Sequence, residues 1–257
     1  MKNIFTVLFL LLTYQSIACS CVTMGVVERY GRADFVAKAK ILDVKPDPER
    51  EEFHILQVQI VELFKGNKVD TLYLNSDLKS SCAFLTPENT TWLIFANKNS
   101  NGELGFGLCS GPEQVDRVFD SSKYPNASKN YRNSLDLKFE VLEYLNSKNI
   151  NPKNEFNLPL FLYRSSLKDF KGIDLGKEKF ALYEVTVKKN LSIQKIKEIK
   201  GFENKKISKK ILQRLKEDLE IGNTDRTEIP KRVKLILPLY YYPGDKKDPS
   251  FLSRHDL

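Results

Sequence analysis

The sequence predicts a mainly β N-terminal domain, folded as a small closed barrel, followed by a smaller α+β domain. Residues 19–110 hold five short stretches rich in β-branched and aromatic residues, separated by turn signals. All four cysteines lie in this half of the chain. After residue 176 the pattern changes to two strands, an amphipathic helix and a last strand.

The first 18 residues are typical of a signal peptide. Lys2 precedes an apolar run, and Ser16 and Ala18 stand at positions −3 and −1 before Cys19. The run is too short to span a bilayer. We therefore expect an exported protein, secreted or held in the periplasm or cell envelope, with Cys19 as its first mature residue.

Five strands are predicted in the N-terminal half, and a helix follows them. The strands cover Ala33–Val44, Phe53–Phe64, Thr71–Leu74, Thr91–Asn97 and Leu104–Cys109. Five strands at this spacing indicate a small closed barrel. Leu135, Phe139, Leu142 and Leu145 then recur at helical spacing within Ser134–Asn146.

The domain boundaries follow from these patterns. We expect residues 19–148 to form the barrel with its trailing helix, and residues 149–175 to be a linker, because Pro and Asn favour turns. Residues 176–243 form the α+β domain, and residues 244–257 a polar tail.

The sequence of the second domain predicts the order strand, strand, helix, strand. Its strands cover Phe180–Val187, Leu191–Ile199 and Arg232–Tyr242. Pro238 lacks an N–H group, so it predicts an edge position or a bulge. Asn204 can cap the helix, whose apolar face holds Ile207, Ile211, Leu212, Leu215 and Leu219.

The four cysteines, Cys19, Cys21, Cys82 and Cys109, read first as two disulfides, because their number is even and the chain is exported. A Cys19–Cys21 bridge would close a strained ring, which favours bridges that cross to Cys82 and Cys109. A structural zinc site is the alternative, but the spacings lack paired CxxC clusters.

Charge and histidine content argue against two classes of function. The formal net charge is +8, and residues 188–216 hold eleven Lys and Arg residues. We interpret this segment as a solvated face, because export removes most nucleic-acid partners and Phe202 is its one aromatic. His54 lies inside a strand and His255 near the end of the chain. Without a phosphate loop, a zinc pair of histidines or a nucleophile elbow, we expect no enzyme and no cofactor.

Residues 19–110 resemble the netrin-like (NTR) module of the tissue inhibitors of metalloproteinases. Four features carry the resemblance: the mature start Cys19-Ser20-Cys21-Val22, the segment Ala33-Asp34-Phe35-Val36 with Ala39-Lys40, the turn Phe64-Lys65-Gly66, and the later Cys82, Trp92–Ala96 and Leu108-Cys109. The resemblance implies an OB-type five-stranded barrel with disulfides Cys19–Cys82 and Cys21–Cys109.

In those inhibitors the α-amino group and carbonyl of the first cysteine chelate a protease's zinc. By position, Cys19 would be the chelator, Ser20 would enter the specificity pocket, and Cys21 and Val22 would flank it. The family's third disulfide and its Cys-rich second domain are absent here. Many NTR modules bind partners without inhibiting anything. We therefore expect a non-enzymatic binding or adaptor protein, with metalloprotease inhibition as the alternative and no metal in the free chain.

Residues 176–243 resemble, less specifically, the periplasmic TonB C-terminal domain. The residues concerned are Phe180–Val187, Ile193–Ile199, Ile207–Leu219 and Val233–Tyr241. The resemblance implies edge pairing with a partner strand. The turn Lys189-Asn190-Leu191 lacks the family's glycine, and we expect no energy-transducing role. An unrelated α+β domain of common topology is the alternative.

Acylation of Cys19 would exclude the bridged arrangement. Ser16-Ile17-Ala18-Cys19 loosely fits a lipoprotein cleavage site, and lipidation would use the Cys19 sulfur and bring the chain to a membrane. Three cysteines would then remain, so the even count favours the disulfides.

Overall fold

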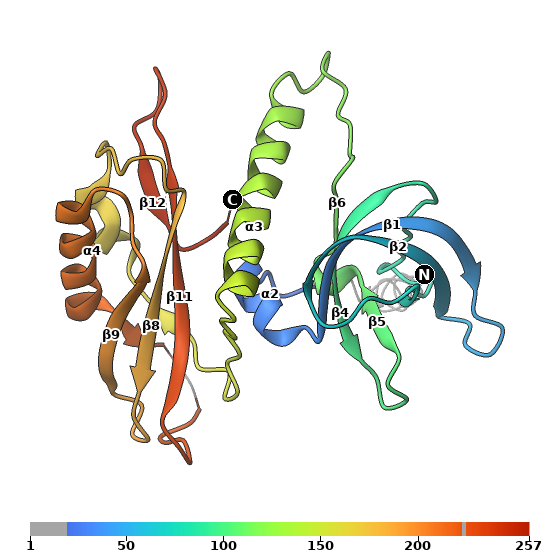
Figure 1. The fold of residues 1–257 in the computed structure, drawn as a ribbon, viewed down its shortest axis with the longest axis horizontal. Helices are drawn as coiled ribbons and strands as arrows, with labels where there is room; N and C mark the ends of the chain where they lie inside the picture. Colours follow the sequence, from blue (N-terminus) through green and yellow to red (C-terminus); the bar gives the residue numbers. More distant parts are fainter. Residues whose placement is uncertain (1–19, 223–224, 257) are drawn as a thin grey trace, which may run out of the picture.

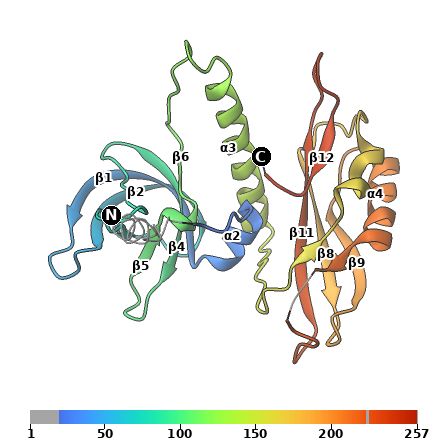
Figure 2. The same cartoon turned by 180° about the vertical axis from the view of Figure 1, so that it is seen from behind.

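The computed structural model describes residues 20–222 and 225–256, and it places three layers side by side along the long axis (Figures 1 and 2). A β-barrel forms one end and a four-stranded sheet with a covering helix forms the other. The helices α2 (Val26–Arg32) and α3 (Ala127–Ser147) lie between them. The predicted signal peptide and Cys19 lie outside the described residues.

The barrel has five strands and closes on itself, as the sequence predicts. Its strands are β1 (Phe35–Pro46), β2 (Phe53–Lys65), β3 (Thr71–Asn75), β4 (Thr91–Lys98) and β5 (Leu104–Gly107). They follow the order β1-β2-β3-β5-β4, and β4 pairs back onto β1. The β3–β5 pair is parallel and the other pairs are antiparallel, so this is a mixed barrel.

Alternation along β1 and β4 explains how the barrel attaches to the rest of the molecule. Phe35, Ile41 and Ile94 point into the barrel core. Leu93 and Phe95, of opposite parity, pack outward in a second core with α2 and α3. Because β4 is buried on both faces, its sequence Trp-Leu-Ile-Phe-Ala is continuously apolar.

The second core joins the barrel to the distant sheet. It contains Val141 and Leu142 of α3, Phe64 of the barrel, and Leu182 and Tyr240 of the sheet. A short 3₁₀ turn, η1 (Leu108–Ser110), and a strand, β6 (Glu113–Gln114), lead from the barrel towards α3. Helix α3 begins at Ala127, earlier than the predicted Ser134, and α2 was not predicted.

The distant sheet has the order β12-β11-β8-β9. Its strands are β8 (Phe180–Val187), β9 (Ile193–Lys200), β11 (Val233–Tyr242) and β12 (Phe251–Ser253). Helix α4 (Lys205–Asp218) covers the face away from the barrel (Figure 1). Asn204 caps it as predicted, with its side-chain oxygen accepting from the Ile207 N–H at 3.2 Å.

Pro238 occupies an edge, as predicted. The short β12 pairs only with Tyr240–Tyr242 of β11, so β11 has no partner strand on its outer side at Pro238 within the described residues. A proline is accepted there because no ladder hydrogen bond is lost.

Two segments expected to be a linker and a tail are packed against the molecule. Residues 149–175 include β7 (Leu160–Phe161) and η2 (Arg164–Phe170), and they bury five apolar side chains in the core beneath α4. These side chains belong to Leu158, Leu162, Leu167, Phe170 and Leu175. The expected polar tail contributes β12 and the buried Leu252. The remaining strand, β10 (Glu220–Ile221), pairs with β7.

Candidate docking rim and its groove

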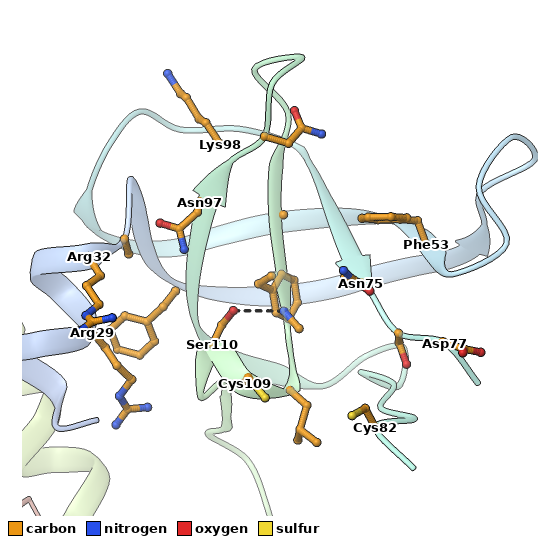
Figure 3. A pocket seen from close by; sticks show the side chains of 18 of the residues that line it. Arg29, Arg32, Phe53, Asn75, Asp77, Cys82, Asn97, Lys98, Cys109 and Ser110 are labelled. Atoms are coloured by element: carbon orange, nitrogen blue, oxygen red, sulfur yellow. Dashed lines mark hydrogen bonds between the residues drawn. The ribbon is translucent and has the colours of Figure 1, made fainter. Parts of the chain in front are cut away.

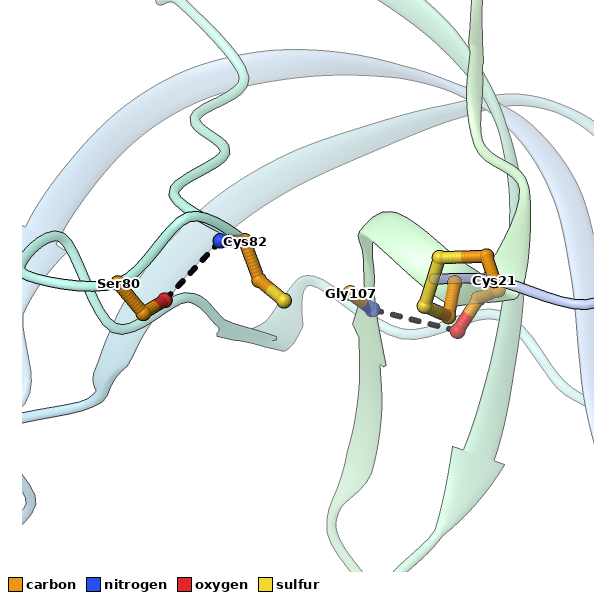
Figure 4. The surroundings of a disulfide bond; sticks show 6 residues. Cys21, Ser80, Cys82 and Gly107 are labelled. Atoms are coloured by element: carbon orange, nitrogen blue, oxygen red, sulfur yellow. Dashed lines mark hydrogen bonds between the residues drawn. A yellow bond between two sulfur atoms is a disulfide. The ribbon is translucent and has the colours of Figure 1, made fainter. Parts of the chain in front are cut away.

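The start of the described chain is covalently fixed to the barrel. A disulfide joins Cys21 to Cys109, 88 residues later, with a Cα–Cα distance of 5.1 Å (Figure 4). Cys109 lies in η1, directly after the last barrel strand, so the bridge holds residues 20–22 at the end of the barrel. This confirms the pairing implied for Cys21 and Cys109.

Cys82 also forms a disulfide, and its expected partner, Cys19, lies outside the described residues. The loop around Cys82 is well held. The Cys82 N–H donates to Ser80 Oγ at 3.2 Å, and the Phe84 N–H donates to the buried Ser76 Oγ at 2.7 Å. Phe84 also packs edge-on against Trp92, with ring centroids 5.5 Å apart. The loop is therefore anchored on both sides of Cys82.

Large apolar side chains are exposed around these cysteines. Ser20, Cys21 and Val22 are all exposed, and the Val22 side chain is 81% accessible. Leu108, beside Cys109, is exposed as well. Leu78 and Leu85, on either side of Cys82, complete a set that we call the docking rim: residues 20–22, Leu78, Leu85 and Leu108.

A groove of about 700 Å³ lies beside the rim (Figure 3). Phe53, Phe95 and Phe106 give it an apolar lining, and Cys82 and Cys109 border it. Its polar lining residues include Asn75, Asn97, Lys98, Ser110 and Arg32. An apolar groove with a few polar groups is the usual form of a binding site.

A buried ionic cluster positions α2 beneath the rim. Arg29 Nη1 lies 3.0 Å from Glu113 Oε1 and donates to the Gly111 carbonyl at 2.5 Å. Lys138 Nζ binds the other Glu113 oxygen at 2.6 Å. Asp256 accepts from the Val26 N–H at 3.2 Å and lies 3.6 Å from Arg29 Nη2. The cluster therefore ties α2 to β6, α3 and the C-terminal segment.

Burial has the largest effect on the pKa of Asp256. Its carboxyl is removed from water, which raises its pKa, while the positive charges of Lys138 and Arg29 act in the opposite direction. Arg29 is held further by the Phe95 ring, whose centroid lies 4.8 Å from its guanidinium carbon. The cluster thus keeps two acids and two cations largely out of water by pairing them.

A second charged cluster lies near the mouth of the barrel. Arg50 pairs with Asp47 at 2.6 Å and Glu103 at 2.8 Å, and its guanidinium stacks over Phe53 and Tyr73. The pKa of Glu103 is lowered by hydrogen bonds from Asn99 and Arg50. The pKa of Asp47 is lowered by the Glu49 N–H and by Arg50. Both carboxyls therefore stay ionised at neutral pH, which suits a structural ion pair better than proton transfer.

His54 is buried in β2 with the same parity as Leu56 and Val58, whose side chains lie in the barrel core. Its Nδ1 has no hydrogen-bond partner among the described residues. Within residues 20–222 and 225–256, no group of three or more His, Cys, Asp or Glu side chains is placed to hold a metal ion.

Sequence reasoning missed Arg29, the Asp256 contact and the groove. A possible signal for α2 was the apolar spacing of Val26, Val27 and Tyr30, which all face the second core. Asp256 binds Val26, 230 positions away in sequence, and Arg29 binds Gly111, 82 positions away, so no local pattern encodes these contacts.

Fold and site together describe an OB-type barrel with a disulfide-fixed rim, joined through a helical layer to an α+β sheet. No protein-family model matches this chain, and no curated protein matches it. In the part of the chain that the structure describes, no helix is long and apolar enough to cross a membrane.

Proposed function

We propose that this chain is an exported, non-enzymatic binding protein of the NTR type that docks a protein partner through the docking rim. The observation that carries the proposal is the exposure of Val22 one residue after a cysteine that is covalently fixed to the barrel. A chain end is normally mobile, and an exposed apolar side chain on it gains no stability from folding.

The physical case rests on preorganisation. Ordering a mobile segment on binding costs free energy, and a disulfide removes much of that cost beforehand. Exposed apolar side chains that cluster on a rigid surface are typical of protein-binding sites. Val22 and Leu108 flank one bridge, and Leu78 and Leu85 lie on the anchored loop that carries the other bridged cysteine.

Charge substitutions on the rim test the proposal. The wild-type chain, Val22→Glu and Leu108→Glu are immobilised, and secreted or envelope proteins of the source are passed over each. Val118→Glu is the matched control, because Val118 is 87% exposed in the loop between β6 and α3. We expect a partner that the wild type and the Val118 variant retain and the two rim variants lose. Equal retention by all four proteins would refute docking at the rim.

Metalloprotease inhibition is the second candidate. It is favoured by the exposed, tethered segment Ser20–Val22, which extends towards the predicted mature end at Cys19. A free α-amine has a pKa near 8, so its neutral form can coordinate zinc. The mature chain is compared with a variant carrying one extra alanine before Cys19, against a panel of zinc metalloproteases. An inhibitor loses its activity in the extended variant, whereas partner binding through Val22 and Leu108 persists.

A further inference from the structure

A second cavity, of about 360 Å³, lies where α2, the loop 152–160, the outer edge of β11 and the C-terminal segment meet. In Figure 1 the C-terminal end of the chain runs from β12 towards the helical layer, which brings it to this junction. The charged side chains that line the cavity are Glu28, Arg32 and Arg254, and His255 lines it as well. We call it the junction cavity.

Among residues 20–222 and 225–256, Arg254 is a partly buried cation with no hydrogen-bond or salt-bridge partner, and Glu28 acts on it only at longer range. No other described residue makes a hydrogen bond or ion pair with it, and its Nε is sealed from solvent without a partner. Burial lowers its pKa, and the negative charge of Glu28 opposes this only in part. Asp256, two residues further on, binds the Val26 N–H and Arg29 instead. Burying a cation that has no ion-pair partner costs free energy, so a gain in folding stability does not explain why Arg254 is buried here.

The other charges of the cavity compensate each other. Glu28 Oε1 accepts from Arg32 Nη2 at 2.9 Å, one helical turn away. Among the lining residues that the structure describes, the Arg254 guanidinium is therefore the charge that no ion pair balances. One guanidinium beside a carboxylate favours a monoanion over a multiply charged phosphate, because Glu28 would repel further negative charge.

The outer edge of β11 supplies a second donor. The Tyr241 N–H donates to the Lys179 carbonyl of the neighbouring chain segment, so odd-numbered residues of β11 bond towards β8. In an antiparallel ladder the even-numbered residues then direct their N–H groups to the other side. Ile236, which lines the junction cavity, therefore presents its N–H on the edge that β12 leaves uncovered.

We propose that the junction cavity binds a carboxylate, which the Arg254 guanidinium grips and the Ile236 N–H orients. Guanidinium and carboxylate match in geometry and form paired, charge-assisted hydrogen bonds. The carboxylate comes either from a free small acid or from the C-terminus of an extended peptide laid along β11. This binding site goes beyond the docking proposed for the rim.

The test follows the Arg254 Nε–H resonance by NMR in the full mature chain. Probes are acetate, tetra-alanine with a free C-terminus, and tetra-alanine amide. We expect acetate and free tetra-alanine to shift the resonance, and Arg254→Met to weaken their binding at least tenfold. Arg164→Met, at an exposed arginine of η2, is the matched control and leaves binding unchanged. If free tetra-alanine binds ten times more tightly than acetate and its amide does not, the ligand is the C-terminus of a peptide. If free tetra-alanine and acetate bind with equal affinity, the ligand is a small acid.

Thermal unfolding separates binding from a structural role. Arg254→Met removes an unpaired, partly buried cation, so its unfolding midpoint stays equal to the wild type or rises. A clearly lower midpoint would assign Arg254 to the fold and overturn the proposal. Absence of any shift with all three probes, or shifts that persist unchanged in Arg254→Met, would overturn it equally.

Discussion

Removal of the Cys21–Cys109 bridge by a double Cys→Ser substitution is expected to lower stability strongly. The bridge closes a loop of 88 residues in the unfolded chain. In the chain-entropy treatment, a loop of that length restrains the unfolded state by about 4–5 kcal/mol. For a protein of this size, that corresponds to a fall in the unfolding midpoint of roughly 8–20 °C.

Trp92 gives a convenient assay, because it is the sole tryptophan and is buried in β4 of the barrel. Urea unfolding followed by its fluorescence measures the loss in the same domain as the bridge. Ser110→Ala is the control: it removes the hydrogen bond from the Gly107 N–H to Ser110 Oγ at the same rim and keeps the bridge. This control costs about 1 kcal/mol.

A loss of unfolding free energy below about 1 kcal/mol in the bridge variant would refute this expectation, because a typical disulfide contributes more than that. Such a small loss would mean that residues 21 and 109 already lie close together in the unfolded chain, or that the barrel is equally stable without the bridge.

Three further perturbations test the helical layer and one barrel turn. Arg29→Ala leaves Asp256 without its ion-pair partner and Glu113 with Lys138 alone, and it should cost about 3–5 kcal/mol in urea unfolding; a loss under 1 kcal/mol contradicts the cluster. Gly66 has φ +87°, and an added Cβ would lie 3.0 Å from the Asp34 carbonyl oxygen, so Gly66→Ala should cost about 1–2 kcal/mol; a neutral result contradicts this turn. Burial raises the pKa of the Asp256 carboxyl in the folded protein above 3.8, so the folded protein binds the carboxyl proton more tightly than the unfolded chain does. Lowering the pH from neutral towards 3.8 should therefore stabilise the wild type relative to Asp256→Asn, whose side chain does not titrate. Parallel pH profiles of the two proteins, measured by urea unfolding from pH 7 to pH 4, would contradict that assignment.

The barrel could be predicted because the sequence of each strand carries its own pattern of apolar and polar residues. Phe35 and Ile41 alternate with outward residues, and Asn204 marks the start of α4. These signals depend on neighbouring residues, and the structure confirms the barrel and the α+β sheet that they indicate.

The helical layer was not predictable in the same way. Helix α2 has seven residues, too few to be stable alone, and it is held by Arg29 and by the contact between Val26 and Asp256. Residues 149–175 carry turn signals at Pro152 and Asn157, which concealed their buried leucines. Contacts between residues far apart in the chain decide these parts of the fold, as between Val26 and Asp256 for α2, and a single sequence does not reveal them.

Peptide mapping of the protein, isolated from its source without reduction, tests the central claim most directly. Mass spectrometry should find an N-terminal peptide that starts with an unmodified amine at Cys19 and is linked through sulfur to the peptides of Cys82 and Cys109. An acyl chain on Cys19, residues 1–18 still attached, or reduced thiols at these positions would contradict a rim clamped at the start of the mature chain.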